Sequence, residues 1–218
     1  GAVGWARGRH GAAVDLGDGP AHLVSVADGL GTWACAEGGS WSLWLRPAAL
    51  AGEQQLVGLG TTATAPWWLG LVAGRPTLRL RGEDGTAYEL SAPAALPVER
   101  WSQLVATYDG ASGRVALVVD GSLVAEDDSA PPRLSIVDAG LALGADEDGT
   151  AGFVGRVDDL RIFDAAIDSA LIDAIRGLAE APVLSWQSPA THYAQLPVGP
   201  VELGLTCWAA DPAVVAID

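Results

Sequence analysis

SWSLWLRP (residues 40–47) is the first of four stretches that together decide the fold. The other three are WSQLVATYDG (101–110), VALVVDGSLV (115–124) and FVGRVDDLRIF (153–163). Each reads as a strand of about 5–8 residues that is alternating or fully apolar and ends at Gly, Asp or Pro. Such a series is typical of stacked antiparallel sheets, so the sequence predicts a β-sandwich.

The same strand signals continue between and around these stretches. Strands are predicted at 55–59, 67–72, 76–81, 86–90, 101–108, 114–120, 122–126 and 140–144, and two short ones flank residues 15–20. Pairs such as Asp84-Gly85 and Asp120-Gly121 supply the backbone conformations that tight turns need. One helix is predicted over 167–177, where apolar residues recur at helical spacing and Asp168 or Ser169 can cap the start.

The order of the four stretches carries a resemblance to a known family. A Trp-bearing strand exits through Arg-Pro, a Trp-led strand ends in Tyr-Asp-Gly, another enters an Asp-Gly turn, and Gly-x-x-Asp-Asp-x-Arg-Ile closes the series. This order resembles the laminin-G-like branch of the concanavalin A-like lectin/glucanase superfamily, from about Gly11 to Gly177.

The resemblance implies an all-β fold, an antiparallel two-sheet jelly roll with one short C-terminal helix. The strands around 15–20 would form its first hairpin. Members of the family are mostly carbohydrate-binding or adhesion modules of secreted enzymes and surface proteins. The resemblance therefore implies a secreted or cell-surface location for this chain.

A domain boundary is predicted near residue 180, at Glu180-Ala181-Pro182. Residues 1–180 would form the jelly roll, and residues 181–218 an extension with one good strand, Val201–Trp208. The extension either docks on the sandwich as an extra strand or opens a next domain; its apolar character slightly favours docking. Cys35 and Cys207 either form a disulfide that ties the extension down or are two separate buried thiols.

Composition excludes two classes of partner. The 218 residues carry a net charge of −15, and all 12 basic residues are Arg. Nucleic acid is not an expected partner, because phosphate binding needs a basic face. No stretch approaches the roughly 18 apolar residues of a membrane span. Lys, Asn and Met are absent while Ala and Gly abound, which is typical of a GC-rich bacterial genome.

Catalysis by glycoside hydrolysis is not expected. Retaining glycosidases need two carboxyl groups about 5–5.5 Å apart, and the glucanase relatives place them on a Glu-x-Asp-x-x-Glu strand. No such strand exists in this chain. Its three acidic clusters, at 83–89, 126–128 and 146–148, are predicted to be solvated turns. A catalytic pair would therefore have to consist of carboxylates that are far apart in the sequence and are brought together by the fold.

Calcium is a possible cofactor, because Asp residues concentrate at turns and Ca²⁺ prefers oxygen ligands. One of the neighbours Asp158 and Asp159 must point inward from its strand, and a buried carboxylate needs a partner. In metal-binding relatives the cation bridges an early loop and this last strand, which here implies Asp158 with Asp15 or Asp18. The alternative is a polar lock, in which Asp158 pairs with Arg or accepts backbone N–H bonds.

The tryptophans carry the remaining functional signal, because sugar rings stack on exposed aromatic rings. The adjacent Trp67 and Trp68 must point to opposite faces, so at least one faces away from the core. With Arg79 and Arg81 on a neighbouring strand they could form a stacking platform, and Arg would suit an acidic sugar. The alternative places one Trp in the core and the other against the extension. Trp44 is also predicted to lie in the core.

The sequence therefore predicts a non-catalytic carbohydrate-binding accessory module of a larger exported bacterial protein, with a polysaccharide or glycan as its partner. Two alternatives remain. The first is a structural domain that binds a protein partner or a neighbouring domain. The second is a glycoside-active enzyme without the usual catalytic strand.

Overall fold

The computed structural model describes residues 3–17, 24–26, 35–61, 63–137, 139–146, 151–177 and 214–217, with 24–26 and 214–217 described by their backbone alone. The larger, eight-stranded sheet has the spatial order β1 (Gly4–Arg7), β2 (Ala12–Asp15), β13 (Gly155–Phe163), β4 (Gly38–Pro47), β9 (Ser102–Asp109), β10 (Arg114–Val119) and β11 (Ser122–Asp127), and β14 (Val214–Ile217) also pairs with β13. The six-stranded sheet has the order β3 (Val24–Val26), β12 (Leu141–Leu143), β5 (Glu53–Leu59), β6 (Trp67–Val72), β7 (Arg75–Arg81) and β8 (Ala87–Ser91). One helix, α1, spans Ser169–Gly177.

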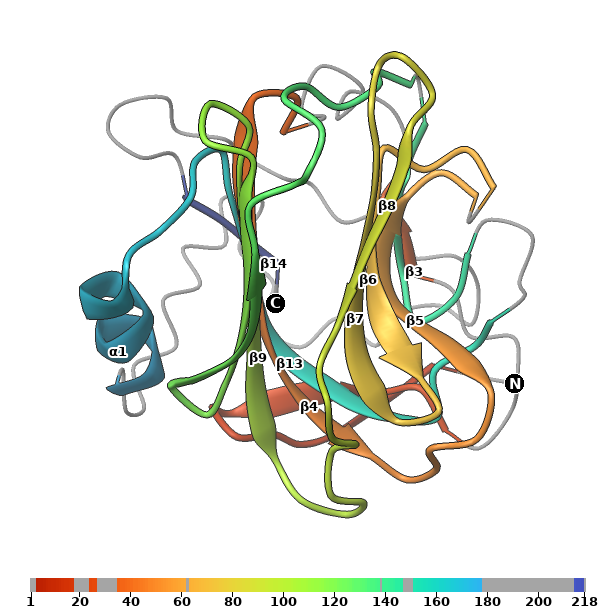
Figure 1. Ribbon diagram of the computed structural model, residues 1–218. Coiled ribbons are helices and arrows are strands. Elements are labelled where there is room, and N and C mark those ends of the chain that lie inside the picture. Colours follow the sequence, from red (N-terminus) through yellow and green to blue (C-terminus); the bar gives the residue numbers. More distant parts are fainter. Residues whose placement is uncertain are drawn as a thin grey trace, which may run out of the picture.

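The two sheets face each other and enclose one core, as Figure 1 shows. The strand pairs within both sheets are antiparallel, and the core is filled by Leu, Val and Trp side chains from both inner faces. This is the predicted all-β, two-sheet jelly-roll sandwich. The predicted strands that lie among the described residues agree with the observed ones to within about two residues, because period-2 alternation marks the strands of such a sheet well.

In strand β4, alternate residues point to opposite faces of the larger sheet. Trp41, Leu43 and Leu45 are fully buried between the sheets, while the residues between them point to the outer face. Trp41 and Trp44 therefore lie on opposite faces, as their spacing predicts. Trp44 is buried, as predicted, at 6% exposure, but on the outer face and not between the sheets: its ring centroid lies 5.7 Å from that of His10, and Arg9 lies over it.

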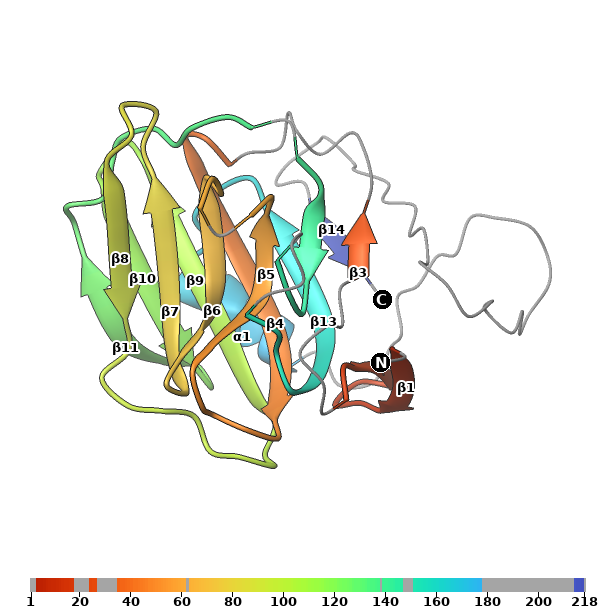
Figure 2. The same cartoon turned by 90° about the vertical axis from the view of Figure 1, so that its right-hand side faces the viewer.

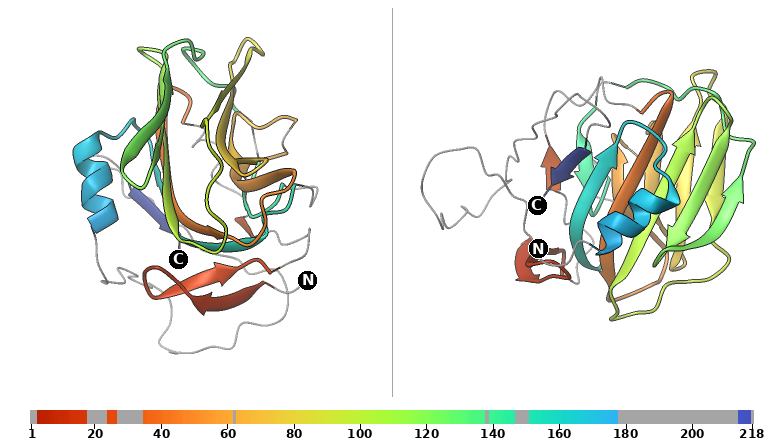
Figure 3. Two further views of the ribbon diagram at one scale, coloured as in Figure 1. Left: turned by 60° about the horizontal axis from the view of Figure 1, so that its bottom comes forward. Right: turned by 90° about the vertical axis from the view of Figure 1, so that its left-hand side faces the viewer.

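The helix and the hairpin turns follow the sequence signals. Asp168 caps α1, since its carboxylate accepts a 2.8 Å hydrogen bond from the Leu171 N–H. The helix packs Ile172 onto the outer face of the larger sheet, against Val105 and Val118, and Figure 3 (right) shows α1 crossing that face. Asp120 and Gly121 both have positive φ in the β10–β11 turn, as the Asp-Gly signal predicts.

The first predicted hairpin is wrong in its pairing. Two strands do lie on either side of residues 16–23, but β2 pairs with β1 and β13 in the larger sheet, and β3 pairs with β12 in the smaller one. The β1–β2 hairpin forms one end of the larger sheet (Figure 3, left). The chain therefore passes from the larger sheet to the smaller one between β2 and β3. The local turn residues do not distinguish this crossing from a hairpin.

Strand β13 lies inside the larger sheet. One edge pairs with β4, and the other is shared by β2, opposite Arg156 and Val157, and by β14, along residues 160–163. A bulge between Asp158 and Arg161 places Asp159 at a φ of 48°. The strand predicted at Val201–Trp208 lies outside the described residues, so the boundary near residue 180 stays a prediction. Among the described residues, no helix is long and apolar enough to cross a membrane.

Candidate functional site

The outer face of the smaller sheet faces the viewer in Figure 2. Polar side chains of β5, β7 and β8 contact one another on this face. In β7, Leu78 and Leu80 point into the core, so Arg79 between them points outward. The strand register pairs Arg79 with Trp68 of β6 on one side and with Glu89 of β8 on the other. Paired residues share a face, so these three side chains lie together on the outside of the sandwich.

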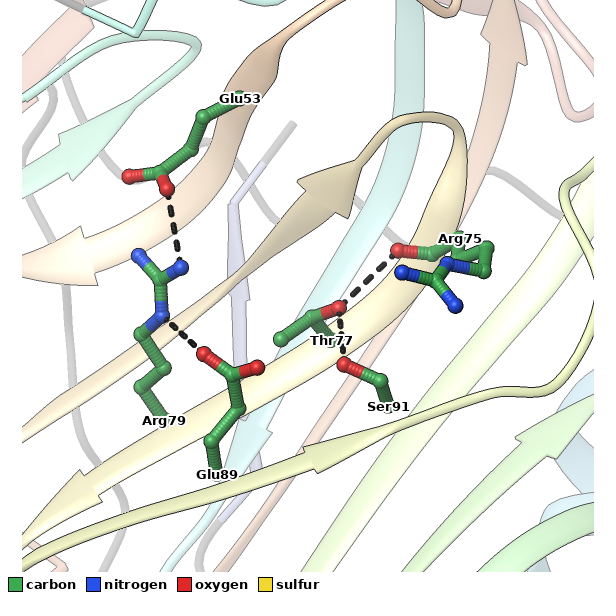
Figure 4. Close-up of polar contacts among 6 residues, drawn as sticks. All are labelled: Glu53, Arg75, Thr77, Arg79, Glu89 and Ser91. Carbon is green, nitrogen blue, oxygen red and sulfur yellow. Dashed lines mark hydrogen bonds and ion pairs between the residues drawn. The ribbon is translucent and has the colours of Figure 1, made fainter.

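Arg79 is held by two carboxylates from different strands (Figure 4). Its Nε donates a 2.7 Å hydrogen bond to Glu89 Oε2, and its Nη2 donates a 2.8 Å bond to Glu53 Oε2 of β5. These charge-assisted bonds fix the plane of the guanidinium. The Nη1 amino group has no hydrogen-bond partner among the described residues.

Two hydroxyl groups lie beside this cluster. Thr77 Oγ1 lies 2.8 Å from Ser91 Oγ across the β7–β8 pair, and it can also donate to the Arg75 carbonyl oxygen at 3.1 Å (Figure 4). We call the five residues Glu53, Thr77, Arg79, Glu89 and Ser91 the outer polar face; Thr77 is itself fully buried. This face offers hydrogen-bond donors from Arg79 and acceptors from both carboxylates in one place.

The two carboxylates of the outer polar face both lie close to Arg79. The hydrogen bond that Arg79 donates to Glu53, opposed by partial burial and reinforced by the bond to Glu89, raises the pKa of Arg79 above its usual value, so the guanidinium stays charged. The side chains of Arg79, Glu53 and Glu89 remain 29%, 36% and 50% exposed, which leaves them open to a ligand. Arg79 therefore lies between two carboxylates, while Arg75 and Arg81, at alternate positions of β7, add positive charge elsewhere on the same side of the sheet.

Trp68 lies beneath this cluster and is not an exposed platform. The Arg79 guanidinium carbon lies 4.6 Å from the centroid of its ring, and only 1% of the residue is exposed. The indole lies over Gly70, where a Cβ atom would overlap its ring. The expectation of an exposed Trp67-Trp68 stacking surface is therefore wrong, because Arg79 itself occupies the outer side of the ring.

Trp67 and Arg81 do not join Arg79 either. Trp67 points into the core, where its ring centroid lies 4.8 Å from that of Trp41. Arg81 is on the outer side, but its Nη2 donates a 2.8 Å bond to the carbonyl oxygen of Ala63, in the loop before β6. Of the four predicted ligand-binding residues, only Trp68 and Arg79 lie together, one covering the other.

Most described carboxylates of the acidic clusters either cap turns or pair with arginines. Asp84 accepts bonds from Thr86, and Asp127 accepts bonds from Ser129; these hydrogen bonds lower the pKa of each carboxyl group. Asp146 differs from the prediction of a solvated turn, because it is only 3% exposed. Its neighbours in the third cluster, residues 147 and 148, lie outside the described residues.

The predicted calcium ligands are engaged with the protein itself. Asp158 is 6% exposed and accepts a 2.8 Å bond from the His10 N–H, while its carboxylate packs against Gly8. Asp15 accepts a 2.9 Å bond from Arg156 Nε. Among the described residues, no group of three acidic, His or Cys side chains could hold a metal. These contacts fit the polar lock better than a calcium site; Asp18 lies outside the described residues, and calcium binding stays a prediction.

Cys35 is a buried thiol whose predicted partner cannot be placed. Its sulfur lies 3.7 Å from the carbonyl oxygen of Phe163, and burial, with a contribution from Asp164, raises its pKa to about 12. Cys207 lies outside the described residues, so the disulfide stays a prediction. The thiol is unreactive at neutral pH in the described environment.

Sequence reasoning missed Glu53 and Glu89 as members of the site. Glu89 could have been found, because a hairpin centred on Asp84 places it opposite Arg79. Glu53 comes from β5, two strands away from β7, and no local signal in the sequence joins it to Arg79. The reasoning also missed Trp5 on β1, which is 53% exposed.

Comparison with known proteins establishes the family. The profile of the Laminin_G_3 family, described as the concanavalin A-like lectin/glucanases superfamily, matches residues 18–173. The chain belongs to this superfamily. A search of curated proteins found no match.

Several solved structures share this superfamily fold. A Ruminococcus gnavus sialidase CBM40 domain bound to α2,3-sialyllactose has 19% sequence identity and a TM-score of 0.64, and the alignment covers 82% of this chain and 100% of that one. Domain 4 of the extracellular arabinanase AbnA from Geobacillus stearothermophilus, in complex with arabinotriose, has 23% identity and a TM-score of 0.64, covering 81% and 82%. A pentraxin from Limulus polyphemus has 15% identity and a TM-score of 0.53, covering 70% and 77%. At these identities the similarity shows the fold alone.

Proposed function

We propose that this chain is a non-catalytic carbohydrate-binding module that acts as an accessory domain of a larger exported bacterial protein, and that its glycan binds at the outer polar face. The observation that carries the proposal is the position of Arg79, held between Glu53 and Glu89 over Trp68. Sugar hydroxyl groups both donate and accept hydrogen bonds, whereas Arg only donates and carboxylates only accept. This cluster offers both functions on partly exposed side chains.

Similar folds support the same function and the exported context. Two of the similar structures are a sialidase CBM40 bound to sialyllactose and an arabinanase domain in complex with arabinotriose, and the arabinanase is described as extracellular. Most described carboxylates of the acidic clusters cap turns or pair with arginines, which supports a binding role over glycoside hydrolysis.

The test is affinity electrophoresis of the whole chain through gels that contain neutral or acidic polysaccharides. We expect at least one polysaccharide to retard the wild-type chain. Arg79→Ala should weaken that binding about tenfold or more, because it removes a charged hydrogen-bond donor. The melting temperature of the variant is measured alongside to show that it folds.

Arg114→Ala is the matched control. Arg114 forms a similar cross-strand pair with Glu126 on β10 and β11, in the other sheet, and its side chain is 62% exposed. Its removal should leave the retardation unchanged. If no polysaccharide retards the wild-type chain, the carbohydrate-binding proposal is wrong.

A structural domain that binds a partner is the second candidate, and one observation favours it. Val3 and Trp5, two positions apart before and within β1, are 40% and 53% exposed, more than large apolar residues usually are. A neighbouring domain could cover them. Trp5→Ser should not change glycan binding if the outer polar face is the glycan site; loss of binding in this variant would move the site to the β1–β2 hairpin.

Calcium is tested in the same gels. A structural ion at Asp158, Asp15 and Asp18 would make retardation or the melting temperature sensitive to EDTA. Equal results with calcium and with EDTA would leave the polar lock as the role of Asp158.

A further inference from the structure

The charges of the outer polar face bear on which glycans it can bind. Arg79 alone would attract the carboxylate of an acidic sugar. However, both its Nε and its Nη2 already donate to carboxylates, at 2.7 Å from Glu89 and 2.8 Å from Glu53. An anion that reaches the free side of Arg79 therefore meets two negative charges close to the positive one.

From this arrangement we propose that the outer polar face selects neutral glycans by binding a pair of adjacent hydroxyl groups, and that it rejects acidic ones. This inference rests on the carbohydrate-binding function proposed above. One hydroxyl can accept a bond from Arg79 Nη1 while it donates to a carboxylate oxygen, and its neighbour can do the same at the other carboxylate. A sugar carboxylate can only accept, so it cannot satisfy Glu53 or Glu89.

Trp68 contributes to this selectivity by fixing the guanidinium. Because the ring is covered by Arg79 and only 1% exposed, it cannot stack on a sugar without displacing that side chain. Recognition therefore depends on the hydrogen bonds of Arg79, Glu53 and Glu89. The net charge of −15 over the chain adds a longer-range repulsion that also disfavours acidic polymers at low salt.

The experiment compares the wild-type chain with Glu53→Gln/Glu89→Gln on neutral polysaccharides (arabinan, xylan and mannan) and on acidic polygalacturonate. We expect a neutral polymer, but not polygalacturonate, to retard the wild-type chain, with little effect of NaCl. The double variant should bind the neutral polymer at least tenfold more weakly, because it loses its charged acceptors. It should also gain retardation by polygalacturonate that NaCl removes, because Arg79 is no longer neutralised.

Glu126→Gln is the matched control, since Glu126 pairs with Arg114 in the larger sheet, and it should behave as wild type. If the double variant is unstable, the single variant Glu89→Gln, at the more exposed carboxylate, gives the same test with about half the loss of charge.

The selectivity would be overturned if polygalacturonate retarded the wild-type chain more strongly than the neutral polymers and Arg79→Ala abolished that retardation. The binding function would then still stand. A double variant that gains no retardation by polygalacturonate would also overturn it, and retardation by no polymer at all would refute both proposals.

Discussion

At the scale of single residues, the site depends on a residue without a side chain. Gly70 lies under the indole of Trp68, and the position of that ring sets the height of Arg79 above the sheet. A Cβ atom at residue 70 would overlap both the Trp68 ring and the backbone carbonyl oxygen of Gln54. The ring could turn away, but the carbonyl belongs to the neighbouring strand and cannot move without disturbing the sheet.

Gly70→Ala should therefore destabilise the fold by about 1–3 kcal/mol, the usual cost of overpacking a closely packed site. Thermal unfolding measures the loss. Gly177→Ala is the control, because no atom lies within 4 Å of a Cβ atom added there and Ala favours the helix. Equal stability of Gly70→Ala and wild type would show that the Trp68 ring is not closely packed on the sheet.

The sequence specifies which face each residue of the site occupies, but not how deeply it is buried. Alternation along β6 correctly separates Trp67 from Trp68. It cannot show that Arg79, from the next strand, covers the outward ring, because that depends on the rotamers of two long side chains. The two carboxylates decide those rotamers, and Glu53 reaches the site only through the order of strands in the sheet.

At the scale of secondary structure, α1 is attached to the larger sheet by a few contacts. Ile172 and Ile175 are buried, and Arg176 Nη1 donates a 2.9 Å bond to the carbonyl oxygen of Asp120 in the β10–β11 turn. The helix is short, so its stability comes from packing rather than from intrinsic propensity.

Ile172→Ala should lower the free energy of unfolding by about 2–4 kcal/mol, since it leaves a cavity against Val105 and Val118. Urea unfolding measures this change. Leu171→Ala, at the preceding and only half-buried position, should cost less than half as much. Similar losses in the two variants would mean that α1 does not pack through Ile172.

Strands and the helix could be predicted well from sequence, while the pairing of the early strands could not. Period-2 patterns, Asp-Gly turns and the Asp168 cap are local signals, and each of them is found in the structure. Strands β2 and β3 are also locally correct. Their partners, β13 and β12, lie more than 100 residues away in the chain, and short apolar strands carry no information that distinguishes a hairpin from a crossing between sheets.

At the scale of the whole molecule, two buried acidic groups, Tyr108 and Cys35, and the partly buried Tyr88 make stability sensitive to alkali. Burial raises the pKa of Tyr88 and Tyr108 from 10.0 to about 12, and that of Cys35 from 9.0 to about 12. The unfolded chain loses the Cys35 proton above about pH 9 and the tyrosine protons above about pH 10, while the folded chain holds all three until about pH 12. The folded state is therefore stabilised by these groups below pH 9 and loses that stability as the pH rises toward 12.

Denaturant unfolding between pH 8 and pH 11 should show this decline, together with the absorbance change of tyrosinate on unfolding. Tyr108→Phe should be less stable than wild type at pH 8 by about 1–2 kcal/mol, because the hydroxyl donates a 2.7 Å bond to the Pro131 carbonyl oxygen. Its stability should fall less steeply with pH, since one titrating group is gone. Parallel curves for the two proteins would show that Tyr108 ionises alike in both states.

The position of β13 inside the larger sheet has a consequence for the order in which the protein can be completed during synthesis. Its partners on its two sides, β2 and β4, emerge from the ribosome more than 100 residues before it does. The hairpins β6–β7 and β7–β8 can form as soon as their strands are synthesised. One edge of β4, by contrast, stays unpaired until β13 (residues 155–163) has been synthesised. A nascent chain that stalls before this point exposes a ready template for pairing with other chains. We therefore expect the nascent chain to be most exposed to such pairing while the region between β11 and β13 is translated.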